Sequence, residues 1–434
     1  MHAPEPARTI GYTTATAIVV ASMIGTGVFT TLGLQSQELH TGFALLFLWA
    51  LGGLIAMAGA LCYGELAAAM PRSGGEYHFL GRIYHPALGI AAGWISVTIG
   101  FAAPSALAAM AFARYMRTFY DVPQVPAAVT IIVIIAAFHA FSVRVGQRFH
   151  VVTTAMKLAL VVVFCTAGLL VEPVVALSVV PSSPAWREVL SPGFAVSLIY
   201  VSYAYSGWNA ATYVASEVSN PQRTIPAALL HGTLVVTALY LLVNGVFLRT
   251  IPAADLEGSI EVGALAADHI FGDFGGVLVS GMICVLLIST ISALTMAGPR
   301  VLQVAGEDLS GLQPLAARTR TGAPLRAILL QQLLAIGFVL TDSFEGVLSY
   351  AGFTLNLVAL LTVAGVFVLR YAEPDLERPY RVWGYPFTPA VFVLLNAIIL
   401  IFVLQARPIA AGAGLVTVLS GVVLAFLHKR SRPS

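Results

Sequence analysis

Long apolar runs, separated by short polar segments, recur along the whole chain. A helix of about 20 apolar residues crosses the hydrocarbon core of a bilayer. The pattern predicts twelve membrane-spanning helices, at residues 10–34, 42–70, 87–119, 125–142, 150–172, 193–217, 225–249, 272–304, 325–341, 343–369, 387–406 and 409–427. Residues 1–434 are therefore expected to form one all-α membrane domain, with no separate soluble domain.

Composition supports this class of protein. The 434 residues are 58% hydrophobic and only 10% charged, a balance that is not typical of soluble domains. The formal net charge of +2 gives no reason to expect a nucleic-acid partner. Cys62, Cys165 and Cys284 all lie within apolar runs, so they are interpreted as core residues and not as disulfide or metal ligands.

The distribution of Lys and Arg predicts the orientation, because cytoplasmic loops are enriched in both. With the N-terminus in the cytoplasm, sixteen of the 22 basic residues fall on the inner side, five on the outer side, and Lys157 inside a span. We therefore expect a multi-pass protein of the cytoplasmic membrane, surrounded by lipid, with both termini in the cytoplasm.

The first predicted span carries two glycines near its middle. Gly25 and Gly27 flank Thr26, and glycine costs a helix about 1 kcal/mol relative to alanine. One explanation is close packing against another helix. The other is a broken helix whose freed N–H groups bind a carboxylate. The candidate binding residues here are Ile24, Gly25, Thr26 and Gly27.

The sixth predicted span contains a second candidate break, where Gly207 lies beside Ser206 and close to Asn209. Spans one and six are five apart and run in opposite directions. Two interrupted helices at matching positions are typical of inverted-repeat transporters. The unwound carbonyl groups are then expected to face a substrate amino group, and the candidate residues are Tyr203, Ala204, Tyr205, Ser206 and Asn209.

Three separated motifs resemble those of the amino acid–polyamine–organocation (APC) superfamily of permeases. Residues 22–29 resemble its span-one signature, residues 60–77 its motif in span two and the following loop, and residues 203–221 span six of its L-type amino acid transporter branch. The resemblance implies a LeuT-type 5+5 inverted repeat with broken helices 1 and 6. The repeats are expected at residues 10–172 and 193–369, with two additional helices at 387–427.

The resemblance also implies roles for single residues. Tyr203, the first aromatic of the second break, is expected to gate the site. Trp208 is a second gating candidate, although packing alone would also explain it. Animal L-type relatives join a glycoprotein partner through a cysteine in the loop after span three. Residues 120–126 contain no cysteine, so no disulfide-linked partner is expected here.

Lys157 is a charge inside the fifth predicted span. Such a residue is usually functional, although its long stem can also extend to the helix end. The resemblance implies that it occupies the place where sodium-coupled relatives bind an ion, and that it bridges to the unwound part of span one. It can then replace sodium structurally or carry a proton, and both roles stay open. Ser289 and Ser292 of span eight are expected to line the same place.

Glu65 and Glu217 lie near the cytoplasmic ends of spans two and six. They are either gate partners of arginines such as Arg72 and Arg223 or ordinary charges at helix ends, which is the slightly favoured interpretation. No carboxylate is expected close to the two breaks, and this favours a neutral substrate.

The chain carries no GxxxxGK[ST] stretch, no HExxH and no spacing typical of metal ligands. No cofactor, metal or enzymatic activity is therefore expected. We predict a sodium-independent secondary transporter of neutral, small L-amino acids that works by alternating access, through either proton symport or amino acid exchange. The alternative is a non-transporting amino acid sensor on the same scaffold.

Overall fold

The computed structural model describes residues 8–430 apart from positions 142–145, 176–177, 309, 318, 320–323 and 342. Regular structure in the described part is helical, except for an isolated β-bridge between Ile10 and Val218. The prediction of an all-α protein is therefore confirmed.

The first predicted five-span unit contains nine α-helices and a π-helical segment in the described part. In chain order they are α1 (Tyr12–Met23), α2 (Gly27–Thr30), α3 (Leu32–Gln35), α4 (Gly42–Ala69), α5 (Glu76–Ile83), α6 (Pro86–Ile95), the π-helix η1 (Ser96–Ala102), α7 (Ala103–Met116), α8 (Gln124–Phe141) and α9 (Gly146–Leu170).

The rest of the described chain follows the same pattern of long helices with short connecting ones. Its elements are α10 (Ser183–Val189), α11 (Pro192–Ala204), the 3₁₀ helix η2 (Ala210–Glu217), α12 (Pro221–Thr250), α13 (Ala253–Leu256), α14 (Val262–Phe271), α15 (Asp273–Asp308), the 3₁₀ helix η3 (Ser310–Ala316), α16 (Leu325–Val339), α17 (Phe344–Ala372), α18 (Phe387–Ala406) and α19 (Pro408–Arg430).

Eight helical segments of the described part are long and apolar enough to cross a membrane. They are Tyr12–Thr30, Gly42–Ala69, Pro86–Met116, Pro221–Thr250, Phe274–Gln303, Phe344–Ala372, Phe387–Ala406 and Pro408–Phe426. Shorter apolar helices overlap the other four predicted spans, at Gln124–Ala140, Met156–Leu170, Pro192–Ala204 and Leu325–Val339. The protein is therefore a multi-span helical membrane protein.

Local chemistry explains where several long helices begin. The Thr41 side chain accepts a hydrogen bond from the backbone N–H of Ala44 and caps α4, and Ser343 caps α17 in the same way. The seventh predicted span begins at Pro221 and not at residue 225. Proline is well suited to the first helical position, because the N–H that it lacks would have no helical partner there.

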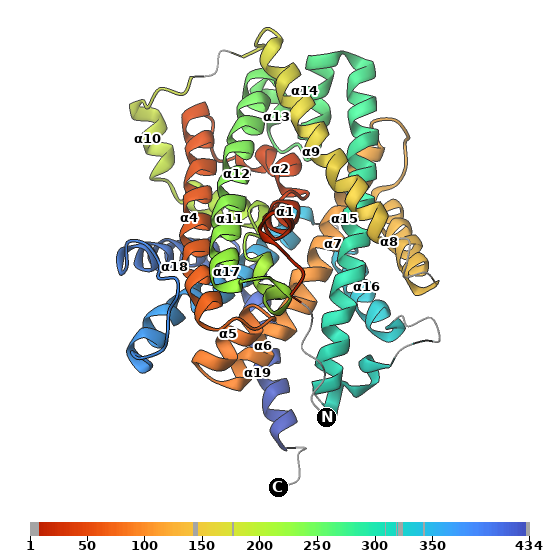
Figure 1. The fold of residues 1–434 in the computed structure, drawn as a ribbon. Coiled ribbons are helices and arrows are strands. Elements are labelled where there is room, and N and C mark those ends of the chain that lie inside the picture. The colour runs from red at the N-terminus through yellow and green to blue at the C-terminus, as the bar shows by residue number, and fades with distance from the viewer. Residues whose placement is uncertain are drawn as a thin grey trace.

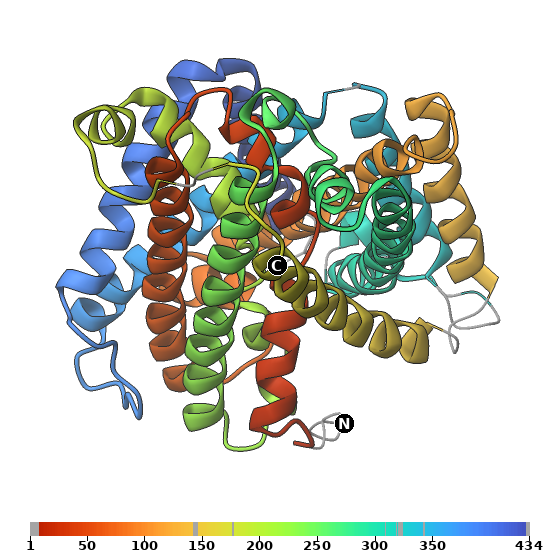
Figure 2. The same cartoon turned by 90° about the horizontal axis from the view of Figure 1, so that it is seen from above.

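The interrupted helices lie close to the centre of the bundle (Figure 1). Helices α4 and α12 run side by side, α1 packs against α12, and α11 packs against α4, α17 and α18 (Figure 2). Helices α13 and α14 lie together at one end of the molecule, and α5 and α6 lie toward the opposite end (Figure 1). This packing brings residues 24–27 and 203–209 together inside the protein.

Candidate functional site

The first predicted break is present. Helix α1 ends at Met23, Ile24 leaves the helical conformation with φ −75° and ψ 89°, and α2 begins at Gly27. Among the described residues, the backbone N–H groups of Gly25 and Thr26 have no hydrogen-bond partner. A side chain built on Gly25 would find no atom closer than the Met23 oxygen, at 4.0 Å. Gly25 therefore combines free N–H donors with open space.

The second predicted break is present as well. Helix α11 ends at Ala204, and Gly207 has φ +101°, a conformation that residues with a side chain rarely adopt. A Cβ atom at Gly207 would lie 2.7 Å from the carbonyl oxygen of Ser22. The chain then resumes as the 3₁₀ helix η2 from Ala210. Glycine is thus required at position 207 by both conformation and space.

The two breaks touch each other. A Cβ atom at Gly27 would lie 2.6 Å from the Cα atom of Ala204, so Gly27 permits the two half-helices to meet. Close packing and an interrupted helix are therefore both present, at different positions, while carboxylate binding at the break stays a prediction. Gly27 serves close packing, while Gly25 lies at the opened backbone.

Tyr240 of α12 connects the ends of the two broken helices. Its hydroxyl oxygen lies 2.6 Å from the carbonyl oxygen of Met23 and 3.1 Å from that of Ala204. A hydroxyl group has one proton, so Tyr240 donates to one carbonyl group at a time while staying close to both. Sequence reasoning missed this residue, because nothing in its own stretch distinguishes it from other buried aromatic residues.

The aromatic side chains around the second break are divided between two surroundings. Tyr203 is buried, and its hydroxyl group interacts with the side chain of Thr26. Tyr205 instead packs against Tyr240 and donates a hydrogen bond of 3.1 Å to the carbonyl oxygen of Trp49. The Tyr205 side chain is therefore part of the packing between helices, whereas the Tyr203 side chain lies against Thr26 of the first break.

Trp208 lies in a packing position. Its ring meets that of Tyr63 edge to face with a centroid separation of 4.7 Å, and it also contacts Phe392 of α18. A Cβ atom at Gly59 would lie 2.9 Å from the Trp208 ring. These contacts support the packing interpretation of Trp208, so only Tyr203 is kept as a gating candidate.

The carbonyl groups at the second break are not equally available. The Tyr203 oxygen accepts the N–H of Ser206 at 2.9 Å, and the Ala204 oxygen faces the Tyr240 hydroxyl. Among the described residues, no donor is bonded to the carbonyl oxygens of Tyr205 and Ser206. These two oxygens are the acceptors most available to a bound ammonium group.

Asn209 is held by the protein, which the sequence did not suggest. Its amide donates hydrogen bonds to the carboxylate of Glu76 and, at 3.3 Å, to the Tyr213 hydroxyl. Glu76 belongs to the loop helix α5 and is buried. The expectation that no carboxylate lies close to the breaks was wrong, because packing brings this loop residue against η2. The spacing of 133 residues concealed the contact.

Lys157 is buried, and its ammonium group donates a hydrogen bond of 2.8 Å to the Thr290 hydroxyl of α15. Lys157 was expected to bridge to the unwound part of span one, but its hydrogen bond in the structure is to α15. Ser289, the neighbour of Thr290, is buried in the same helix. Ser292 shares a hydrogen bond of 2.7 Å with His139 of α8, so its hydroxyl group is already engaged by another side chain.

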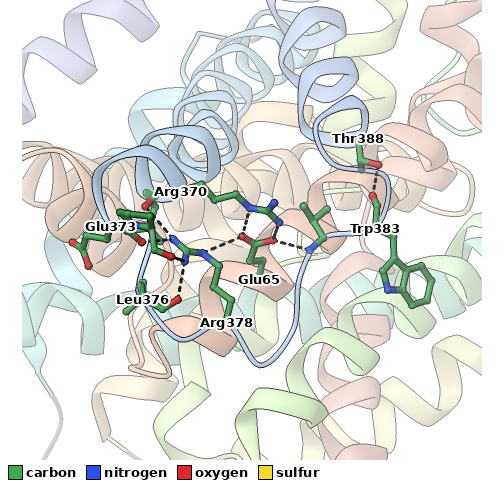
Figure 3. Close-up of polar contacts among 10 residues, drawn as sticks. Glu65, Arg370, Glu373, Leu376, Arg378, Trp383 and Thr388 are labelled. Carbon is green, nitrogen blue, oxygen red and sulfur yellow. Dashed lines mark hydrogen bonds and ion pairs between the residues drawn. The ribbon is translucent and has the colours of Figure 1, made fainter.

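Glu65 is the centre of a charge network (Figure 3). Arg370 at the end of α17 donates to both carboxylate oxygens, at 2.8 and 2.6 Å, and the Val382 N–H donates at 2.6 Å. Arg378 lies 3.6 Å from the same carboxylate. Glu65 therefore holds the segment between α17 and α18 against α4.

This network corrects the partners expected for the two glutamates. Glu65 pairs with Arg370 and Arg378, and not with Arg72 or Arg223. Glu217 is exposed and forms no ion pair within the described residues. The charge at the end of span six is thus an ordinary helix-end charge, whereas the one at the end of span two is a buried structural partner.

Comparisons with known proteins identify the family of this chain. The family model for amino acid permeases matches residues 10–426, so the chain belongs to the amino acid permease family of the APC superfamily. It is an amino acid transporter of that family, and not an enzyme.

Mammalian relatives match across nearly the whole chain. Large neutral amino acids transporter small subunit 2 of Mus musculus is 28% identical over 97% of this chain and 81% of its own length. The b(0,+)-type amino acid transporter 1 of Homo sapiens is 27% identical over 97% and 88%, respectively. Asc-type amino acid transporter 1 of Mus musculus is 27% identical over 98% and 82%.

Proposed function

We propose that this protein transports neutral L-amino acids, preferably small ones, across the cytoplasmic membrane by alternating access and without sodium. The observation that carries the proposal is the contact between the two breaks. Unbonded N–H groups at Gly25 and Thr26 lie in one broken helix, and unbonded carbonyl oxygens at Tyr205 and Ser206 lie in the other. Donors on one side and acceptors on the other suit a zwitterion.

The proposed fold is a LeuT-type bundle of twelve membrane helices. Its first repeat covers residues 10–172, its second covers 193–369, and two additional helices follow at 387–427. Support comes from the two breaks, which fall in the first and sixth of the predicted spans. The distribution of Lys and Arg supports an orientation with both termini in the cytoplasm.

In the proposed binding mode, the substrate carboxylate accepts hydrogen bonds from the N–H groups of Gly25 and Thr26. Its ammonium group donates to the carbonyl oxygens at Tyr205 and Ser206. Tyr203, which reaches Thr26, closes over the bound molecule. A substrate held by both broken helices ties them together, so its binding favours the conformation in which they are aligned.

Lys157 is proposed to take the place of a sodium ion. Its ammonium group brings a positive charge to α15, where it bonds Thr290. A neighbouring cation opposes the binding of sodium beside Ser289 and Ser292. The lysine then serves either as a fixed bridge between α9 and α15 or as a carrier of protons, which correspond to amino acid exchange and proton symport.

One relative is by its name a transporter of large neutral amino acids, which supports a neutral substrate but not the proposed preference for small ones. The three cysteines, Cys62, Cys165 and Cys284, are buried and free. We therefore propose that the chain works without a disulfide-linked glycoprotein partner.

The test is uptake of radiolabelled neutral amino acids into proteoliposomes, with and without a proton gradient, sodium and internal substrate. Lys157→Ala is compared with Lys157→Met, which keeps most of the side-chain volume without the charge. We expect uptake by the wild type that does not respond to sodium.

Loss of the proton response in both variants assigns Lys157 to proton coupling. Uptake that needs internal substrate and ignores the proton gradient identifies an exchanger. Binding without any uptake would refute transport and favour the sensor.

A further inference from the structure

An apolar groove lies between the C-terminal ends of α9 and α12, toward the end of the molecule where α13 and α14 lie (Figure 1). Its volume is about 370 Å³, and ligand-binding clefts typically measure about 300–1,000 Å³. Its walls include Leu169, Pro173 and Val175 on one side and Leu242, Gly245 and Arg249 on the other. No residue of the two breaks lines this groove, so it is separate from the proposed substrate site.

The groove is open because α12 carries a glycine on this face. Positions 241, 245 and 249 are spaced by four, so they lie along one face of the helix. A Cβ atom at Gly245 would have no other atom within 4 Å. The neighbouring side chains of Leu169 and Leu242 are 49% and 41% exposed, and exposed apolar side chains of membrane-spanning helices face lipid. Gly245 therefore leaves a gap on a surface that faces lipid.

Arg249 forms the polar end of the groove. Its guanidinium group donates hydrogen bonds to the carbonyl oxygens of Leu169 at 3.3 Å and Val171 at 2.8 Å, where α9 ends. Its own carbonyl oxygen accepts the N–H groups of Val174 at 3.0 Å and Val175 at 3.1 Å. The last carbonyl groups of a helix have no partner within it. These contacts therefore cap the ends of both helices and fix the guanidinium group in place.

Capping leaves the charge of Arg249 without a counter-charge. Carbonyl oxygens are neutral, and no carboxylate of the described residues forms an ion pair with Arg249. Glu172, the acidic residue of the segment that follows α9, is exposed. A guanidinium group has five N–H donors. Two of them bond carbonyl oxygens and the Nε–H is buried without an acceptor, so two donors on the Nη atoms remain for an anion.

We propose that this groove binds an anionic phospholipid, whose acyl chain lies along Gly245 and whose phosphate group contacts Arg249. The groove offers both chemistries of such a molecule, an apolar surface open to lipid and a fixed cation at one end. Arg249 lies in the last turn of a helix that is long and apolar enough to cross a membrane, and phospholipid headgroups lie at that depth. The planar guanidinium group also matches phosphate in geometry.

The test measures lipid binding to the purified, delipidated protein in detergent. Phosphatidylglycerol and phosphatidylcholine with identical acyl chains are added in parallel, and inorganic phosphate is added in a third series. The readouts are the rise in unfolding temperature and the number of lipid molecules retained in native mass spectrometry. The two lipids differ in net charge, and inorganic phosphate has no acyl chain, so the three series separate the contributions of the charge and of the groove.

Two substitutions are compared with matched controls. Gly245→Leu fills the groove, and its control is Gly281→Leu of α15, because a Cβ atom at Gly281 also has no other atom within 4 Å and Gly281 does not line the groove. Arg249→Gln removes the charge at the groove. Its control is Arg117→Gln, which removes a guanidinium group that pairs with Asp121 at 3.9 Å beyond the end of α7.

We expect the wild type to bind phosphatidylglycerol more tightly than phosphatidylcholine by up to about fivefold, the contribution of a partly exposed ion pair. Gly245→Leu is expected to lose the retained lipid and this preference, and Arg249→Gln to bind both lipids equally, while the controls behave as the wild type. Because Arg249 also caps α9, only the rise in unfolding temperature caused by lipid is compared. Gly245→Leu keeps the cap and tests the proposal even where Arg249→Gln does not fold.

Equal affinity of the wild type for the two lipids would overturn the proposal, and so would a preference that persists in Gly245→Leu or in Arg249→Gln. Stabilisation of the wild type by inorganic phosphate as strong as that by phosphatidylglycerol would overturn the role of the groove, because the anion alone would then account for binding. None of these measurements involves transport, so their outcome is independent of the proposed function.

Discussion

Tyr240→Phe is expected to weaken substrate binding by loosening the contact between the two broken helices. The substitution removes the hydroxyl group that lies 2.6 Å from the Met23 carbonyl oxygen and 3.1 Å from that of Ala204. The ring itself remains, and with it the packing against Trp49 and Tyr205 at centroid separations of 5.4 and 5.0 Å. The change is therefore confined to one buried donor.

The magnitude follows from the surroundings. Tyr240 is fully buried, with 0% of its surface exposed. A buried acceptor that loses its donor costs about 1–3 kcal/mol. The hydroxyl donates one proton, so a single hydrogen bond is lost and the lower half of this range applies, about 1–2 kcal/mol. We expect the affinity for substrate to fall by at most roughly 5- to 30-fold, a limit that is reached when all of this free energy favours the arrangement of the breaks that binds substrate.

The assay is a binding isotherm for a transported amino acid on purified protein, together with thermal unfolding in the same detergent. Tyr84→Phe is the matched control, because its hydroxyl also donates to a backbone oxygen, that of Leu361 at 2.9 Å, away from the breaks. An affinity for Tyr240→Phe equal to that of the wild type and of Tyr84→Phe would refute the idea that Tyr240 sets the geometry of the site.

Two further substitutions test the framework around the site. Gly207→Ala places a side chain at φ +101° and 2.7 Å from the Ser22 carbonyl oxygen, and we expect the backbone strain alone to lower the free energy of unfolding by about 1–3 kcal/mol. The measurement is the unfolding temperature, and the control is Gly245→Ala, whose new side chain would have no atom within 4 Å. Equal unfolding temperatures of the two variants would contradict the strain. Glu65→Gln leaves the Arg378 guanidinium, 5% exposed, without its charge partner. Removing one member of a buried pair costs about 3–5 kcal/mol, so we expect a clearly lower unfolding temperature. An unfolding temperature close to that of the wild type would show that the network does not hold the segment between α17 and α18.

The positions of the helices were largely predictable. Apolar runs predicted helical segments throughout, since any membrane helix must satisfy its backbone hydrogen bonds internally and expose apolar side chains to lipid. The glycines at positions 25, 27 and 207 predicted both breaks, because glycine tolerates backbone conformations that other residues avoid. The start of α12 at Pro221 was missed, because apolar periodicity does not fix helix ends.

The assignment of individual side chains was less successful, for a physical reason. Lys157 was recognised from its rarity in an apolar run, but its partner Thr290 is 133 positions away. Glu65 was recognised at a helix end, and its arginine partners were sought nearby in sequence although they lie beyond residue 369. Hydrophobic patterns report which residues avoid water, but they contain no information about which helix faces which.

The sequence by itself thus determined the class of protein, the location of the two breaks and the presence of a charge inside the fifth span. Each of these depends on local composition, which the cost of burying charge and unpaired backbone in lipid controls directly. Only the tertiary structure decided that Tyr240 connects both breaks and that Glu76 lies against Asn209. Those contacts join elements far apart in the chain. A hydrogen bond forms only when its donor and acceptor are placed to within a few tenths of an ångström, and packing alone sets that placement.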